Sequence, residues 1–264
     1  MPPYVYVIIG LSSIFLATTL GSSFVFFFRK KEINPKLNQI FIGFASGVML
    51  AASIFSLLMP AMEEEVTYMP SWLLVSLATL LGALFMWGID KIIPHIHAGE
   101  NKDEGLPARS VSKNTKMFLA VLIHNIPEGL SVGIAFGVAL ANPTNEGLLF
   151  GALMLAIGLS IQNIPEGTVV SLPIKGETNN SKKAFLFGTL TGIVEPISGL
   201  IGLFLAMSIQ FIMPWALAFS AGCMIYVVVE EMIPEMKGDS HGHHGVWAFI
   251  LGFVIMMILD ISLG

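Results

Sequence analysis

The chain has 264 residues, of which 55% are hydrophobic and only 12% are charged, and its mean hydropathy is +0.79. A soluble domain of this size could not keep such a composition in water, so these values exclude a water-soluble protein and indicate a membrane protein. The net charge of −5 is small and gives no indication of a nucleic-acid partner. Cys223 is the only cysteine, which excludes an internal disulfide and a multi-cysteine metal site. Any metal would need His, carboxylate, amide or thioether ligands.

Eight stretches are apolar and long enough, at about 20 residues, to cross a bilayer as helices. They lie near residues 4–28, 37–62, 70–93, 117–140, 147–173, 183–209, 212–236 and 246–263. The first stretch lacks a basic start and runs into three basic residues, so we expect a retained helix rather than a signal peptide. We therefore expect one all-α transmembrane domain over residues 1–264.

The basic residues test this count, because the loops between eight helices must alternate between the two sides of the bilayer. All 13 Lys and Arg residues fall on one side: Arg29, Lys30, Lys31, Lys36, Lys91, Lys102, Arg109, Lys113, Lys116, Lys175, Lys182, Lys183 and Lys237. The positive-inside rule assigns this side to the cytoplasm, including a histidine-bearing loop over residues 94–116. We expect a multi-pass protein of the cell inner membrane with both termini extracytoplasmic.

Two internal repeats are visible. The segments 47–50 and 59–62 of the second predicted helix resemble 222–225 and 233–236 of the seventh, which runs in the opposite direction. This match favours an inverted repeat of helices 1–3 and 6–8 around a central pair, as transporters often show, with chance similarity between Gly/Met-rich segments as the alternative. The central pair itself carries His-Asn-Ile-Pro-Glu-Gly at 124–129 and Gln-Asn-Ile-Pro-Glu-Gly at 162–167.

A proline inside a helix removes one backbone hydrogen bond, so Pro127 and Pro165 are expected to kink the two central helices and release carbonyls near mid-membrane. Backbone opened at this depth is tolerated only where it faces protein or a wet cavity. Both motifs lie near the middle of their spans. We therefore expect them to meet at a cavity at the bilayer midplane.

Three acidic residues are predicted at the same depth: Glu128, Glu166 and Glu195. Each charged group at mid-membrane costs roughly 2.5 to 3.5 kcal/mol on the insertion scale, and no Lys or Arg accompanies these three. The compensating charge must come from protons or a bound cation. Residues four apart share a helical face, so His124 with Glu128, and Gln162 with Glu166, converge inward.

With the amides of Asn125 and Asn163, these residues form a mixed nitrogen and oxygen ligand set. Such a set suits divalent zinc, iron, manganese or cadmium, whereas calcium and magnesium fit less well because imidazole is a poor ligand for hard cations. Any one of these residues alone could serve an ordinary structural role. The duplicated motif favours the functional interpretation.

Further candidates lie toward the two membrane surfaces. On the outer side, Glu63, Glu64 and Glu65 could concentrate cations, with Ser56 one stage deeper. On the inner side, short histidine-rich tracts lie beside two glutamates and could act as a metal relay or sensor: His95, His97, His241, His243 and His244, with Glu230 and Glu231. Solvated helix ends and solvated loops are the alternatives for the two sets.

At the paired motifs, HNIPEG at 124–129 and QNIPEG at 162–167, the chain resembles the ZIP family of metal transporters, and Gln162 with the 43–49 segment makes it look like the bacterial GufA-type branch. The resemblance implies a binuclear centre. One metal would be held by Met49, His124, Glu128, Gln162 and Glu166, and a second by Asn125, Glu128, Asn163, Glu166 and Glu195. Asn163 stands where some relatives carry Asp, which removes a charge from the second position. The resemblance also implies uptake into the cytoplasm by an elevator-like motion.

The expected function is transport of a divalent transition metal, zinc foremost and also iron, manganese or cadmium, as substrate and with no cofactor. An intramembrane zinc-dependent hydrolase is the alternative from another class. Catalytic zinc usually has three firm protein ligands, whereas His124 is the only histidine expected within the membrane. Besides metal and the lipid bilayer, a second copy of the chain is a candidate partner, because glycine-rich faces permit close helix packing in a homodimer.

Overall fold

The structure, a computed structural model, describes residues 2–27, 34–64, 66–93, 113–208, 212–237 and 242–263, and these residues form helices and no strand. Eight helical stretches among them are long and apolar enough to cross a membrane, which confirms the predicted spans. In chain order they are α1 with η1 (Pro3–Ser23, Phe24–Phe26); α2, η2 and α3 (Pro35–Ala52, Ser53–Leu58, Met59–Glu63); α4 (Ser71–Ile92); α5 (Lys113–Ala141); α6 (Glu146–Thr178); α7 and α8 (Ser181–Gly192, Val194–Ser208); α9, η4 and α10 (Met213–Val227, Val228–Met232, Ile233–Lys237); and α11 (His244–Leu263).

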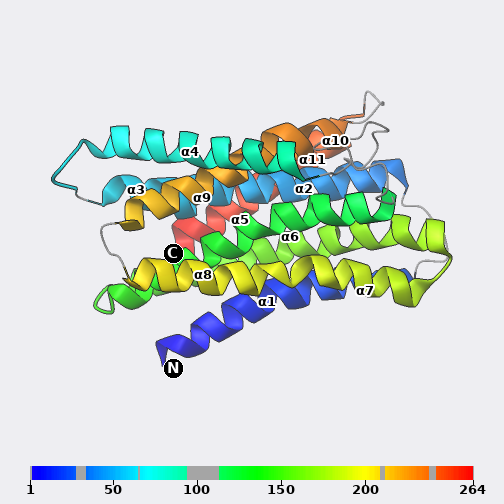
Figure 1. The fold of residues 1–264 in the computed structure, drawn as a ribbon, viewed down its shortest axis with the longest axis horizontal. Coiled ribbons are helices and arrows are strands. Elements are labelled where there is room, and N and C mark those ends of the chain that lie inside the picture. Colours follow the sequence, from blue (N-terminus) through cyan, green and yellow to red (C-terminus); the bar gives the residue numbers. More distant parts are fainter. Residues whose placement is uncertain are drawn as a thin grey trace.

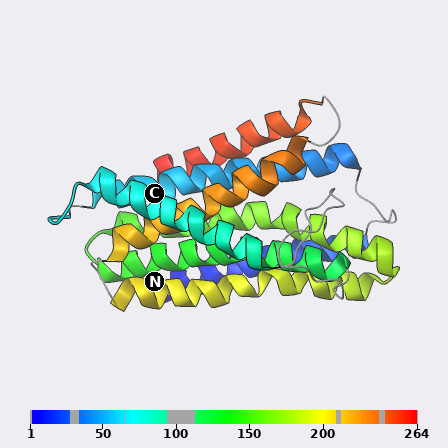
Figure 2. The same cartoon turned by 45° about the horizontal axis from the view of Figure 1, so that its top comes forward.

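The spans lie side by side as one elongated bundle, and both chain ends lie toward the same end of it (Figures 1 and 2). The most extensive packing joins α5 to α8, α2 to α11, α1 to α6 and α4 to α9. Pro3, Pro35 and Pro214 lie in the first turns of their helices, where a missing N–H costs nothing because it would have no partner within the helix. These pairings bring α1, α5, α6 and α8 together around the duplicated motif.

Two spans contain a π-helical segment that hydropathy does not predict. The segment η2 comes just before Pro60 and η4 just before Pro234. A proline cannot donate to the carbonyl four residues earlier, and a π-turn is one way for a helix to continue past that defect. The first segment, η2, spans Ser53–Leu58, and the second, η4, spans Val228–Met232. The second span of the fold therefore has one residue more in its π-helical segment than its repeat counterpart, the seventh.

The sixth span is also interrupted where one helix was expected. α7 ends at Gly192, Ile193 forms a turn, and α8 begins at Val194. Pro196 accounts for the break, because its missing N–H leaves the Gly192 carbonyl without its helical donor. Glu195 therefore sits in the first turn of a new helix. By contrast, α5 and α6 continue through Pro127 and Pro165, so neither central proline ends its helix.

Close glycine contacts show the inverted repeat residue by residue. At four positions of the α2–α11 and α4–α9 contacts, an added Cβ would lie 2.0–2.2 Å from a backbone oxygen of the neighbouring helix. The pairs are Gly47 with Phe249, Gly252 with Phe44, Gly222 with Thr79, and Gly82 with Phe219. The difference in residue number between Gly47 and Gly222 equals that between Phe44 and Phe219. Likewise, the difference between Gly82 and Gly252 equals that between Thr79 and Phe249. The α2–α11 and α4–α9 contacts are thus copies of each other, and the expected repeat is confirmed.

These contacts predict a stability difference between glycines in similar helices. Gly47→Ala forces α2 and α11 apart, so we expect a loss of about 1 to 3 kcal/mol, as for overpacked cores. Gly88→Ala is the matched control, because nothing lies within 4 Å of its added Cβ. Thermal unfolding in detergent should show a lower midpoint for Gly47→Ala and an unchanged or higher one for Gly88→Ala. Equal midpoints in both variants would contradict the packing described.

Candidate metal-binding site

Glu195 is the most fully hydrogen-bonded of the three central glutamates. Thr18 Oγ1 on α1 donates to Glu195 Oε1 at 3.0 Å, and Asn125 Nδ2 on α5 donates to the same oxygen at 2.9 Å. Asn163 Nδ2 on α6 donates to Glu195 Oε2 at 2.9 Å. All four side chains are fully buried. Three helices therefore hold this carboxylate with neutral donors.

The two asparagines occupy equivalent positions around Glu195. Asn125 Nδ2 also donates to the Thr191 carbonyl at 3.1 Å, and Asn163 Nδ2 donates to the Ile14 carbonyl at 3.3 Å. The step along the chain from Ile14 to Thr191 is the same as the step from Thr18 to Glu195. The inverted repeat therefore extends to α1 and to the sixth span.

The duplicated motif leaves several buried oxygens without a hydrogen-bond donor. Gln162 Nε2 donates to Glu128 Oε1, but the second oxygen of Glu128 has no partner. The buried oxygen atoms of the two motifs that accept no hydrogen bond are Asn125 Oδ1, Glu128 Oε2, Gln162 Oε1, Asn163 Oδ1 and Glu166 Oε1. Buried polar atoms without partners are costly, and five acceptors with no donor match the needs of a cation. Side chains with oxygen acceptors of this kind are suitable ligands for a divalent metal.

Among the residues that the structure describes, no Lys or Arg compensates the glutamates. In the described part of the chain, Glu128, Glu166 and Glu195 make no ion pair with Lys or Arg, although each interacts electrostatically with at least one of the others. Glu166 also interacts with the His124 imidazole and with the amides of Asn125 and Gln162. No three His, Cys, Asp or Glu side chains among the described residues lie close enough to hold one ion. A metal site in this conformation would therefore need further ligands, and the amide oxygens of the motifs are available.

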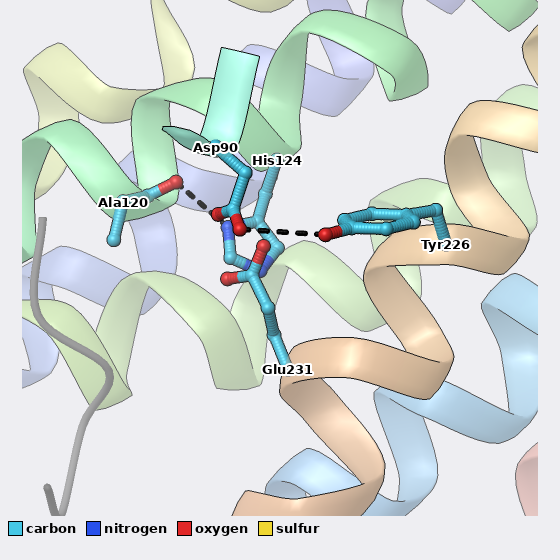
Figure 3. Close-up of polar contacts among 5 residues, drawn as sticks. All are labelled: Asp90, Ala120, His124, Tyr226 and Glu231. Atoms are coloured by element: carbon cyan, nitrogen blue, oxygen red, sulfur yellow. Dashed lines mark hydrogen bonds and ion pairs between the residues drawn. The ribbon is translucent and has the colours of Figure 1, made fainter. Parts of the chain in front are cut away.

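His124 is held by two acceptors. Nδ1 lies 2.7 Å from the Ala120 carbonyl, one turn back on α5, and Nε2 lies 2.8 Å from Glu231 Oε2 on η4 (Figure 3). The contact with Ala120 makes Nδ1 a donor, so only Nε2 could bind a metal. Glu231, expected near the inner surface, instead occupies that nitrogen from a buried position. A metal on His124 would have to displace it.

A cavity of about 90 Å³ reaches the site from the end of the bundle that carries the basic loops. Its polar lining consists of His124, Glu128, Glu166, Glu231 and Glu235, and apolar residues of α2, α5, α6 and η4 complete it. Two of the three central glutamates therefore face this inner cavity. Glu195, Asn125, Asn163 and Gln162 do not line it.

A second cavity, of about 400 Å³, opens at the other end. We call it the outer cavity because Ser56 and Glu63, which are predicted to lie toward the outer surface, line it together with Asp260 of α11. Ser56 Oγ lies 2.8 Å from both Asp260 carboxylate oxygens. None of the central glutamates lines this outer cavity.

The inverted repeat relates the two cavities. The step that relates Gly82 to Gly252 also relates Asp90 to Asp260. Ser56 and Glu231 lie in the two corresponding π-helical segments, η2 and η4. Asp90 on α4 accepts a hydrogen bond of 3.3 Å from Tyr226 Oη of α9 (Figure 3), and Tyr226 also interacts electrostatically with Glu231. Sequence reasoning missed both aspartates. The signal was a carboxylate within an apolar span, overlooked because each lies near a helix end.

The remaining predicted residues lie apart from these contacts. Met49 is fully buried in the hydrophobic core of α2 and does not line the inner cavity. Glu64 follows the end of α3 and does not line the outer cavity, and Glu230, His243 and His244 are exposed. The predicted residues Glu65, His95, His97 and His241 lie outside the described residues.

Comparison with known proteins identifies the family. The chain matches the family described as ZIP zinc transporter over residues 4–117 and 115–260. The chain belongs to the ZIP family. It is similar to zinc transporter ZIP11 of Homo sapiens (33% identity over 94% of each chain) and zinc transporter GufA of Myxococcus xanthus (33% over 96% of this chain and 98% of the relative). It is also similar to zinc transporter ZIPB of Bordetella bronchiseptica, at 32% identity over 98% of this chain and 82% of the relative.

Membership in the ZIP family confirms the principal functional expectation. The protein is a multi-pass membrane transporter of divalent metal and not an enzyme, so the intramembrane hydrolase alternative is wrong. The similarity to GufA agrees with the bacterial branch suggested by Gln162.

The His124–Glu231 contact predicts an energetic coupling between α5 and η4. In metal-free protein, a double-mutant cycle of His124→Gln and Glu231→Gln should give a coupling energy of about 0.5 to 3 kcal/mol, because the two groups share one buried contact. Unfolding in detergent measures it. The control is a second cycle that combines His124→Gln with Glu230→Gln, a change at the exposed neighbour of Glu231. In this cycle the two changes in the free energy of unfolding should be additive. Additivity in the first cycle would contradict the contact.

Proposed function

We propose that this ZIP protein carries zinc into the cytoplasm through the site formed by the two motifs of α5 and α6 together with Glu195 of α8. Zinc is the substrate named for the three relatives described above. The proposal includes insertion in a cell inner membrane with both termini outside. Iron, manganese and cadmium have related ligand preferences and are the secondary substrates.

The observation that carries the proposal is the imbalance of charge and hydrogen bonding at the duplicated motif. Five buried oxygens have no donor, and three glutamates have no Lys or Arg partner in the described residues. If all three were ionised, one divalent ion would leave a charge of −1 and two would give +1. Metal binding thus comes close to neutralising the site, while water or protons must do so in its absence.

The positions of the cavities support a direction of transport. The inner cavity reaches Glu128 and Glu166, whereas the outer cavity is lined by no central glutamate. The described lysines, among them Lys36, Lys175 and Lys237, lie at helix ends on the inner-cavity side. By the positive-inside rule this side faces the cytoplasm, so the conformation is one that releases metal inward.

The ligand set supports transition metals over calcium and magnesium. His124 Nε2 is a good ligand for zinc, and the remaining donors are carboxylate and amide oxygens. Glu128, Gln162, Glu166 and His124 would hold the first ion once Glu231 has moved. Occupation of a second position by Asn125, Asn163 and Glu195, the Met49 ligand role and a homodimer remain predictions.

The proposal predicts loss of transport on removing one carboxylate of the site. Glu128→Gln and Glu166→Gln keep the size of the side chain but remove an anionic ligand, so zinc flux into proteoliposomes should fall at least about 100-fold, because changing even the hydrogen-bond partners of metal ligands typically costs about 10- to 100-fold. A fluorescent zinc indicator inside the vesicles measures the flux.

The matched control is Glu146→Gln, an exposed glutamate at the start of the same helix as Glu166. It should transport as the unchanged protein does. Flux near the unchanged level in Glu128→Gln or Glu166→Gln would show that zinc crosses by another route.

A further inference from the structure

Thr18 of α1 lies outside both duplicated motifs, yet it contacts the central site. Its hydroxyl is fully buried and lies 3.0 Å from Glu195 Oε1. It also lies 3.2 Å from the Ile14 carbonyl, the usual acceptor for a threonine within a helix. A hydroxyl has one proton to donate, so the two acceptors compete for it.

The surroundings of Thr18 copy those of Glu195. An added Cβ at Gly129 would lie 2.1 Å from the Glu195 carbonyl oxygen, and one at Gly167 would lie 2.2 Å from the Thr18 carbonyl oxygen. Gly129 and Gly167 are the final residues of the two motifs, so they are equivalent positions of the repeat. The repeat therefore places Thr18 and Glu195 at equivalent positions.

The asparagines complete this symmetry. Asn125 and Asn163 each donate one bond to a backbone carbonyl, at Thr191 and Ile14, and one to Glu195. Because the two carbonyls are themselves repeat-equivalent, the amides face the shared space between positions 18 and 195 from related directions. That space holds one carboxylate, from Glu195, and one hydroxyl, from Thr18.

The geometry points to Thr18 as a positioning residue of the metal site: its hydroxyl holds the Glu195 carboxylate against the Asn125 and Asn163 amides, which leaves the two amide oxygens free of donors for the cation. With both Nδ2 atoms turned to Glu195, both Oδ1 atoms face away from it and are buried without partners. This inference rests on the proposed function and adds a residue of α1 to it.

Single substitutions test the hydroxyl. Thr18→Val keeps the shape and removes the donor, so we expect the apparent KM for zinc flux to rise about tenfold with the maximal rate less affected, as for loss of a hydrogen bond to a charged group. Thr18→Ser restores the donor and should return KM to within about twofold of the unchanged protein. Thr19→Val is the control, because the Thr19 hydroxyl has no hydrogen-bond partner.

An exchange of the two side chains tests the symmetry. Glu195→Thr alone should reduce zinc flux strongly, and the double variant Thr18→Glu with Glu195→Thr should recover at least about tenfold over it, since the same two amides can reach a carboxylate placed at position 18. If Thr18 only fills space, the double variant is no better than Glu195→Thr. Thermal unfolding and gel filtration in detergent confirm that each variant is folded before its flux is compared.

The outcomes separate this inference from the proposed function. Thr18→Val with an unchanged KM, Thr18→Ser as defective as Thr18→Val, or a double variant no better than Glu195→Thr would overturn the role of Thr18, provided that Glu128→Gln is inactive. If Glu128→Gln transports zinc normally, the proposed function itself fails. Recovery by Thr18→Ser and by the exchange supports the inference.

Discussion

The structure depends on one electrostatic constraint: the buried carboxyl groups of Glu128 and Glu195 and the half-buried one of Glu166 lie inside an apolar bundle without a Lys or Arg partner among the described residues. Neutral side chains donate hydrogen bonds to two of these carboxyl groups. Thr18, Asn125 and Asn163 donate to Glu195, and Gln162 donates to Glu128. The negative charge that these donors do not neutralise has to be balanced by a positive charge that can enter and leave, a proton or a metal ion. A site that is nearly but not fully satisfied by its own protein can bind a dication and also release it, which a transporter requires.

The inverted repeat explains why the site has this composition. Spans related by the repeat run in opposite directions, so each contact at one end of the bundle has a counterpart at the other. The glycine contacts of α2 with α11 recur between α4 and α9, and Asp260, which accepts from Ser56 at the outer cavity, corresponds in the repeat to Asp90, which accepts from Tyr226 at the other end. The repeat is not symmetric in chemistry. At one end of the bundle η4 brings Glu231 to His124, whereas at the other end η2 brings Ser56 to Asp260, and this difference distinguishes the two ends.

Hydropathy and charge placement predicted the eight spans, because the bilayer imposes a minimum apolar length that is visible in the chain. The paired motifs predicted which helices bring the central glutamates together, since a carboxylate at mid-membrane is rare enough to be informative. The details of contact were not predictable in the same way. Thr18 reads as an ordinary helical threonine, and its role depends on how α1 packs against α6 and α8. The π-helical segments and the break at Ile193 arise at prolines whose position was visible but whose local geometry was not. Likewise, Glu231 was assigned to the inner surface, because nothing in the sequence shows that η4 brings it to His124.

The central claim is that the acidic cluster between α5, α6 and α8 exists to hold a divalent metal, and one measurement tests it most directly. Crystals of the protein soaked with zinc or cadmium would show the metal by anomalous scattering. We expect a peak within about 2 to 2.5 Å of carboxylate oxygens of Glu128 and Glu166, with the His124–Glu231 contact opened. A fully loaded crystal with peaks only at the outer or inner cavity mouths, and with Glu128 still accepting its bond from Gln162, would contradict it.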